Sequence, residues 1–157
     1  MTTTTAISSL LTWLKGLVFG TYLTTIEWKF DRQVTFALAP TPASRPRVTK
    51  WGTYYGKNYT AWKKQAEAFV QTLNGTQDPD ARYAVFVETI AAKPKTSKLT
   101  SPNGDVDNYA KGPLDALTRS EVIWKDDKQI DVLVVTKRWA EPDETPRTEV
   151  FISKGKA

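Results

Sequence analysis

The stretch from residue 105 to residue 127 is strongly acidic, although the chain as a whole carries a formal net charge of +5. Five aspartates fall within these 23 residues: Asp105, Asp107, Asp115, Asp126 and Asp127. Gathering like charges raises the free energy of a folded chain unless something neutralises them. The acidic stretch therefore predicts a fold in which a divalent cation is bound among these side chains.

The chain contains neither histidine nor cysteine, which limits the chemistry open to it. Its metal ligands must be oxygen atoms, and oxygen ligands favour Mg²⁺, or Mn²⁺ in its place, over zinc. The same absence excludes disulfides, thiol catalysis and any triad that uses imidazole as the general base. A chain without cysteine fits a reducing compartment, and we expect a cytoplasmic location.

A sequence pI near 9.4 indicates an anionic partner, for which nucleic acid is the usual candidate. The simpler explanation is that the positive charge only keeps the protein soluble. The distribution of the cations favours nucleic acid. They form two groups, one of Arg45, Arg47, Lys50, Lys57, Lys63 and Lys64, and one of Lys93, Lys95 and Lys98. The second group directly precedes the acidic stretch, and basic flanks beside an acidic, metal-binding centre suit phosphodiester chemistry.

Residues 6–23, AISSLLTWLKGLVFGTYL, are apolar enough to raise the question of a membrane segment. Their aliphatic residues recur at helical spacing, which predicts an amphipathic helix that packs on the domain or on a second subunit. Lys15 lies in the middle of the run, and a length of about 18 residues is at the lower edge for a spanning helix. We therefore do not expect membrane association, which together with a flexible tail is the alternative interpretation.

The next part of the chain predicts a strand, a loop and a helix. Residues 33–39 alternate apolar and polar as in a half-buried strand, which could begin as early as Thr24. Three prolines predict that residues 40–57 form a long loop without regular structure. Asn58 is then expected to cap a helix that ends near Leu73.

The remainder predicts three further strands and one more helix. Residues 82–92 and 129–138 are rich in β-branched and aromatic residues, which is typical of strands. Between them Asp107 starts a predicted helix that ends near Leu117, and residues 148–152 form a last strand. The order predicts an α/β fold in which a small mixed sheet of about four strands packs with helices.

Spacing suggests that these elements bring the acidic residues together. Asp105 and Asp107 are two apart in chain expected to be extended, so their side chains should point the same way. Lys111 lies one helical turn past Asp107 and could donate to a phosphoryl oxygen. An aspartate of the pair Asp126 and Asp127, at the start of the next strand, could close over the first two and complete a three-carboxylate site.

Each part of this constellation also has a simpler explanation. Asp107 alone is more typical of a helix N-cap than of a metal ligand. Lys111 alone would be an exposed partner of Asp107 or Asp115, one turn away on either side. The pair Asp126 and Asp127 would pass as a turn. The occurrence of all of these residues together in a cationic chain favours a metal site.

Two segments of the chain resemble the signature of a known family. GDVDNYAKGPLDAL, followed by IWKDDKQI, is similar to the pattern D-x-D-N-x-x-K-x-x-x-D-A-L … W-x-D-D-x-Q-[IV] of the RusA-like Holliday junction resolvases. The upstream FALAPTPASRPR resembles the Pro-rich segment of that family. The resemblance covers about residues 33–153, so we divide the chain into an N-terminal extension, 1–30, and an endonuclease domain, 31–157.

The resemblance implies a Mg²⁺-dependent endodeoxyribonuclease, of a family common in phages and prophages, that resolves four-way DNA junctions in recombination and repair. It implies Asp105, Asp107 and Asp127 as metal ligands, with Asp126 nearby, and Lys111 as the catalytic lysine. It also implies a homodimer, because paired incisions need two sites related by a two-fold axis. The cations expected to bind the DNA backbone are Arg45, Arg47, Lys50, Lys57, Lys93, Lys95 and Lys98.

Other motif positions are less decisive, and two features depart from the family pattern. Asn108, Asp115 and Gln129 match the motif, but Asp115 could equally serve the fold, and Trp124 is more simply explained by core packing. Gly104 stands where some members of the family carry arginines, and residues 1–30 lie outside the resemblance. A nuclease for flaps and other branched DNA, and an inactive DNA-binding protein of the same fold, are the alternative functions.

Overall fold

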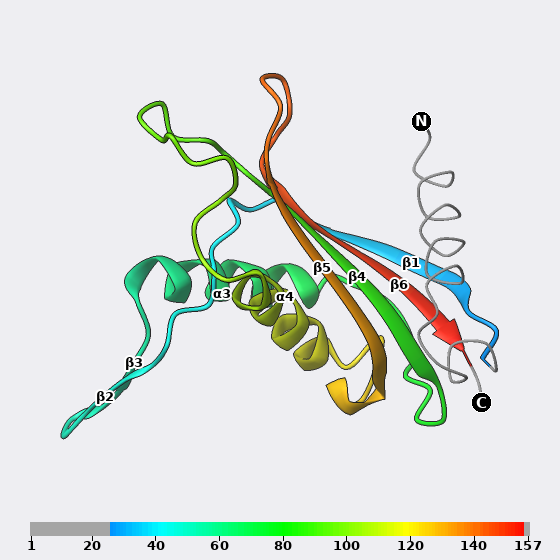
Figure 1. Ribbon diagram of the computed structural model, residues 1–157. Helices are drawn as coiled ribbons and strands as arrows, with labels where there is room; N and C mark the ends of the chain where they lie inside the picture. Colours follow the sequence, from blue (N-terminus) through cyan, green and yellow to red (C-terminus); the bar gives the residue numbers. More distant parts are fainter. Residues whose placement is uncertain (1–25, 156–157) are drawn as a thin grey trace.

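A computed structural model describes residues 26–155 of the chain, and these form a four-stranded sheet, a two-stranded hairpin and two α-helices (Figure 1). The elements are β1 (Lys29–Phe36), β2 (Arg47–Thr49), β3 (Gly52–Tyr54), α3 (Lys57–Val70), β4 (Arg82–Ala91), α4 (Val106–Ser120), the 3₁₀ turn η1 (Asp127–Gln129), β5 (Ile130–Trp139) and β6 (Arg147–Gly155). The predicted helix at residues 6–23 lies outside the described residues, and the division near residue 30 stays a prediction.

The main sheet has the strand order β1-β6-β4-β5, and its pairing is mixed. Strand β6 runs antiparallel to both β1 and β4, whereas β4 and β5 are parallel. Parallel neighbours need a crossover connection, and α4 provides it between β4 and β5. The predicted mixed sheet of about four strands is therefore confirmed.

Both helices lie on one face of this sheet and enclose the core with it (Figure 1). Helix α3 buries Tyr59, Trp62, Ala66 and Val70, which recur at intervals of three and four residues as one helical face requires. Helix α4 packs against α3 at Gly112, where an added Cβ would lie 2.7 Å from Cζ3 of Trp62. Only a residue without a side chain permits this close approach.

The Pro-rich segment is partly regular, which corrects the predicted unstructured loop. All three prolines precede Arg47, so none removes a donor from the pairing of β2 with β3. The strand residues are mostly β-branched or aromatic, and Gly52 takes the positive φ of 134° at the turn. These signals are present in the sequence, but the three prolines outweighed them and led to the prediction of a loop.

Both helix starts also differ from the predictions. Helix α3 begins at Lys57 with Gly56 at the N-cap and no side-chain cap bond, so Asn58 is not the cap. Helix α4 begins at Val106, with Asp105 at the N-cap and Asp107 in the first turn, and it continues to Ser120. A helix end depends on tertiary packing as well as on local signals, so the N-cap of α3 lies two residues before Asn58 and α4 starts one residue before Asp107.

The sheet face opposite the helices carries a second, smaller apolar cluster. Ile26, Trp28 and Ala84 are buried there, with Val132 packed against them. The same sheet holds a network in which Arg138 pairs with Glu88 and Glu144. Within the described residues, no helix is both long enough and apolar enough to cross a membrane.

Candidate functional site

Two aspartates lie exposed at the start of α4. Asp105 is the N-cap residue with extended backbone, φ −74° and ψ 143°, and Asp107 lies within the first helical turn. They are therefore not two residues of one extended segment, as the spacing had suggested. The unpaired N–H groups of a helix N-terminus carry a partial positive charge, which stabilises carboxylates at this position.

The loop before Asp105 is fixed by hydrogen bonds to its backbone carbonyls. The Lys137 ammonium donates to the carbonyl oxygens of Pro102, at 2.9 Å, and of Gly104. The hydroxyl of Tyr109 donates to the carbonyl of Asn103 at 2.6 Å, and burial raises the pKa of Tyr109, so it stays a donor at neutral pH. These bonds fix the direction in which the chain enters α4.

Lys137 is the residue of this site that the sequence patterns did not indicate. It lies near the end of β5, which the motif does not reach. The available signal was a lysine that closely follows the apolar run VLVV at residues 132–135 of the strand. A half-buried lysine in a strand needs polar partners, and only the fold shows that those partners are the carbonyls beside Asp105.

Asn108 connects the acidic pair to the Pro-rich segment. Its backbone carbonyl accepts a 2.8 Å hydrogen bond from the N–H of Ala43. Its side-chain amide donates to Oδ2 of Asp105 at 3.5 Å, a long bond that still points the amide toward the carboxylate. The segment that leads to the β2–β3 hairpin is thus joined to the first turn of α4.

Lys111 lies one turn further along α4 and pairs with Asp115. The separation of Lys111 Nζ and Asp115 Oδ2 is 3.6 Å, and the lysine side chain is 60% exposed. This is the simpler arrangement foreseen for an i,i+4 pair. An exposed pair of this kind is weak, so its lysine can change partners at little cost in free energy.

Asp126 and Asp127 lie at the opposite end of α4 from Asp105. Asp127 opens η1 directly before β5, whereas Lys137, which holds the residue before Asp105, lies near the other end of β5. Ile130 and Lys137 are seven positions apart in the strand, which corresponds to roughly 23 Å. The expected closure of this aspartate pair over Asp105 and Asp107 within one chain is therefore not observed.

The local role of Asp126 is to order the turn that precedes β5. Its carboxylate accepts a 2.9 Å hydrogen bond from the N–H of Lys128. This bond, chiefly, lowers the pKa of Asp126. Across residues 26–155, no group of three or more acidic side chains is placed to hold a metal ion together.

Two other motif residues serve the fold. Gln129 is buried, and its amide spans the loops around the start of β4: Oε1 accepts from the N–H of Lys125 at 2.8 Å, and Nε2 donates to the carbonyls of Asp78 and Ala81, each at 2.9 Å. Trp124 is fully buried and meets the Tyr83 ring edge to face. The expectation that Trp124 packs in the core is confirmed.

The seven cations expected to contact DNA are all exposed. Arg45, Arg47, Lys50 and Lys57 lie on or beside the β2–β3 hairpin, and Lys93, Lys95 and Lys98 lie in the loop between β4 and α4. Both segments lead to the start of α4, since one contains Ala43 and the other ends at Asp105. The acidic pair therefore lies between two basic loops.

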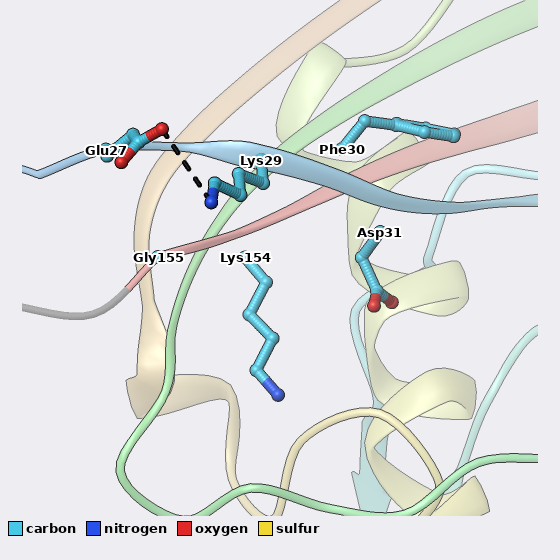
Figure 2. Close-up of a pocket in the computed structure, with 6 residues that line it drawn as sticks. All are labelled: Glu27, Lys29, Phe30, Asp31, Lys154 and Gly155. Atoms are coloured by element: carbon cyan, nitrogen blue, oxygen red, sulfur yellow. Dashed lines mark ion pairs between the residues drawn. The ribbon is translucent and has the colours of Figure 1, made fainter.

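A pocket of about 400 Å³ lies elsewhere, along β1 and the end of β6 (Figure 2). It is lined by Glu27, Lys29, Phe30, Asp31, Lys154 and Gly155. Glu27 pairs with Lys29 across its rim at 3.8 Å, and Lys154 pairs with Asp78 at 3.0 Å. Its charges are thus mutually compensated, and none of the predicted site residues lines it.

Comparison with protein families agrees with the geometry. The family model described as endodeoxyribonuclease RusA matches residues 37–153. The match begins at the end of β1 and includes both basic loops, α4, η1 and β5. No curated protein sequence matches the chain.

Proposed function

Because the chain belongs to the RusA family of endodeoxyribonucleases, we propose that it resolves four-way DNA junctions by hydrolysing opposed phosphodiester bonds. The observation that carries this proposal is the exposed pair Asp105 and Asp107 at the start of α4, between two basic loops. The hydrolysis would leave 5′-phosphate and 3′-hydroxyl ends.

The basic loops would hold the DNA backbone. In the part of the chain that the structure describes, Arg45, Arg47, Lys50 and Lys57 form no ion pair, so their charges are available to phosphates. Each neutralised phosphate releases counterions, so binding should weaken steeply as the salt concentration rises. The strand held in this way would cross the start of α4.

Asp105 and Asp107 would hold a divalent cation, Mg²⁺ or Mn²⁺. Their carboxylates are exposed oxygen ligands, the type that these ions prefer, and the chain has no nitrogen or sulfur ligand from His or Cys. When bound, such a cation supplies an activated water and neutralises charge on the phosphoryl group. Lys111, on the same helix, would release Asp115 and donate to a phosphate oxygen.

A homodimer would account for the distance between Asp127 and the acidic pair. An isologous two-fold interface in which α4 runs antiparallel to its copy would place Asp127 of the partner subunit beside Asp105 and Asp107. The third carboxylate would then come from the other chain. The same symmetry provides two sites for two opposed strands.

The test is cleavage of matched four-way, flap and linear DNA in Mg²⁺ by the wild type and by Asp107→Asn. The substitution preserves size and removes charge, so we expect junction binding to persist and cleavage to fall about 100-fold or more. Glu27→Gln is the matched control, because Glu27 is 79% exposed on the far edge of the sheet. Equal cleavage by Asp107→Asn would refute the proposed site. A preference of the wild type for flap DNA would indicate that flaps, not four-way junctions, are the substrate.

Mixed dimers test whether the site is shared between chains. If it is, a dimer of Asp107→Asn and Asp127→Asn chains has one doubly altered site and one intact site, so it should nick one strand. If each site is built within one chain, both sites lack a ligand and the mixed dimer should be inactive. The two homodimeric variants serve as inactive references.

A further inference from the structure

We propose that the β2–β3 hairpin is a base-stacking probe, in which Trp51 at the turn stacks on an unpaired nucleobase where the DNA strands open. The inference rests on the proposed function for its substrate, DNA with a branch point. It adds a residue that reads the opened bases, at a distance from the residues that would cut the backbone.

The hairpin stands apart from the rest of the protein (Figure 1). Every residue from 45 to 58 is exposed, so the hairpin contributes nothing to the core. Its turn is nonetheless ordered by its own side chains. Thr49 Oγ1 lies 3.2 Å from the carbonyl of Gly52 and accepts from the N–H of Trp51 at 3.2 Å, while the Tyr54 hydroxyl donates to the carbonyl of Trp51 at 3.2 Å.

Trp51 presents a large apolar surface to solvent at this turn. It is 78% exposed, and within the described residues no other aromatic ring packs against it. The Lys50 ammonium lies 5.0 Å from the centroid of the indole. An aromatic ring beside a cation is the arrangement that stacks a base while the cation meets the adjoining phosphate.

The charge around Trp51 has a single sign. Residues 32–66 contain seven Arg and Lys residues and no Asp or Glu. Those nearest the turn are Arg45, Arg47, Lys50 and Lys57, which are unpaired among the described residues. A single-signed basic surface with an exposed indole at its tip complements a polyanion that carries aromatic rings.

The position of the base of the hairpin favours nucleic acid over an anionic membrane as the partner that binds the hairpin. Ala43 is bonded to Asn108 in the first turn of α4, and Gly56 donates to Ser44 Oγ at 3.0 Å across the two ends of the hairpin segment. The base of the hairpin is therefore attached to the helix that carries Asp105 and Asp107. We therefore expect a DNA strand held at that helix to extend toward the hairpin, and this favours nucleic acid over a lipid surface.

Binding without metal tests the proposal separately from cleavage. Affinities are measured by fluorescence anisotropy in EDTA for linear duplex DNA and for a junction with unpaired bases at its centre. For Trp51→Ala we expect about a 10-fold or greater loss of affinity for the junction, because the unpaired base can no longer stack on an aromatic ring. Duplex affinity should stay within about twofold of the wild type, and Trp51→Phe should recover part of the loss.

Val48→Ala is the matched control, because Val48 is 79% exposed on the same hairpin and has no aromatic face. It should leave both affinities unchanged. Equal junction binding by Trp51→Ala, or equal losses on junction and duplex, would overturn the proposal. So would a loss of binding to phosphatidylglycerol vesicles without any change on DNA.

The outcomes separate this inference from the proposed function. Cleavage of junctions by the wild type together with unimpaired binding by Trp51→Ala would reject the stacking probe alone. Absent cleavage in Mg²⁺ together with a selective loss in Trp51→Ala would reject the nuclease and support the probe. Circular dichroism of each variant verifies the fold, which a residue outside the core should not alter.

Discussion

Ala43 and Asn108 are 65 positions apart in the chain, yet the backbone N–H of the first donates to the carbonyl of the second over 2.8 Å. This hydrogen bond attaches the Pro-rich segment to the first turn of α4. An added Cβ at Gly104 would lie 3.4 Å from Cγ of Pro42, so the two segments also pack closely there. The segment that leads to the basic hairpin is consequently packed against the start of the helix that carries the acidic pair.

Lys137 should position the acidic pair without contacting DNA itself. Lys137→Ala removes two hydrogen bonds to the loop before Asp105. We expect the cleavage rate to fall about 10-fold, because small displacements of catalytic groups are costly, while the apparent KM changes little. Single-turnover kinetics on a four-way junction measure the two parameters separately.

The conservative variant and a distant lysine provide the controls for this experiment. Lys137→Arg can still donate to two carbonyls and should restore part of the rate. Lys29→Ala, whose side chain is 77% exposed on β1 at the opposite edge of the sheet from β5, should behave as the wild type. A parallel loss in KM and rate by Lys137→Ala would point to DNA contact instead.

Gln129 should matter for stability rather than for cleavage chemistry. Gln129→Met keeps the volume but leaves the N–H of Lys125 and the carbonyls of Asp78 and Ala81 without these partners. We expect a loss of about 2–3 kcal/mol in the free energy of unfolding, seen in urea as a lower midpoint at constant slope. Gln65→Met, on the exposed side of α3, should change it by less than about 0.5 kcal/mol.

Adding even one methyl group at the contact between α3 and α4 should destabilise the protein. Gly112→Ala improves helix propensity by about 1 kcal/mol, but its Cβ would overlap the Trp62 ring. Overpacking costs about 1–3 kcal/mol, so we expect a net loss near 1 kcal/mol and a lower Tm. The loss should shrink in a Trp62→Phe background, and an unchanged loss there would show that Trp62 is not the obstacle.

The ion-pair network of Arg138 with Glu88 and Glu144 should make the stability of the protein depend on pH. Hydrogen bonds from Arg138 lower the pKa of Glu144 from 4.5 to about 2. A lowered pKa in the folded state stabilises above the unfolded value and is lost as the pH falls from about 4.5 toward 2. Glu144→Gln should therefore cost about 1 kcal/mol at pH 7, after allowance for solvent screening, and roughly half as much at pH 3.

Urea unfolding of the wild type and Glu144→Gln at pH 7 and pH 3 measures this difference. Asp143→Asn, at the exposed neighbouring position of the same turn, is the control and should show little change at either pH. A gap between the wild type and Glu144→Gln that stays constant across this range would contradict the role assigned to the network.

The strands were the most predictable part of the fold. β4 and β5 follow the runs of β-branched and aromatic residues closely, because burial on the sheet selects such side chains. The helix starts were less predictable. The N-cap of α3 is Gly56, which has no side chain to form a capping hydrogen bond. The β2–β3 hairpin was missed, since its short strands are wholly exposed and have no buried face to impose a pattern.

The sequence by itself determined which chemistry is available: oxygen ligands, a cationic surface, and a motif whose order and spacing are readable in one dimension. Tertiary structure decided where those residues lie. It placed Asp105 and Asp107 beside the Pro-rich segment that leads to the hairpin, and Asp127 about one strand length away, because α4 and β5 are rigid and hold their two ends apart. Spacing along a chain limits how far apart two residues can be, but only packing shows whether they meet.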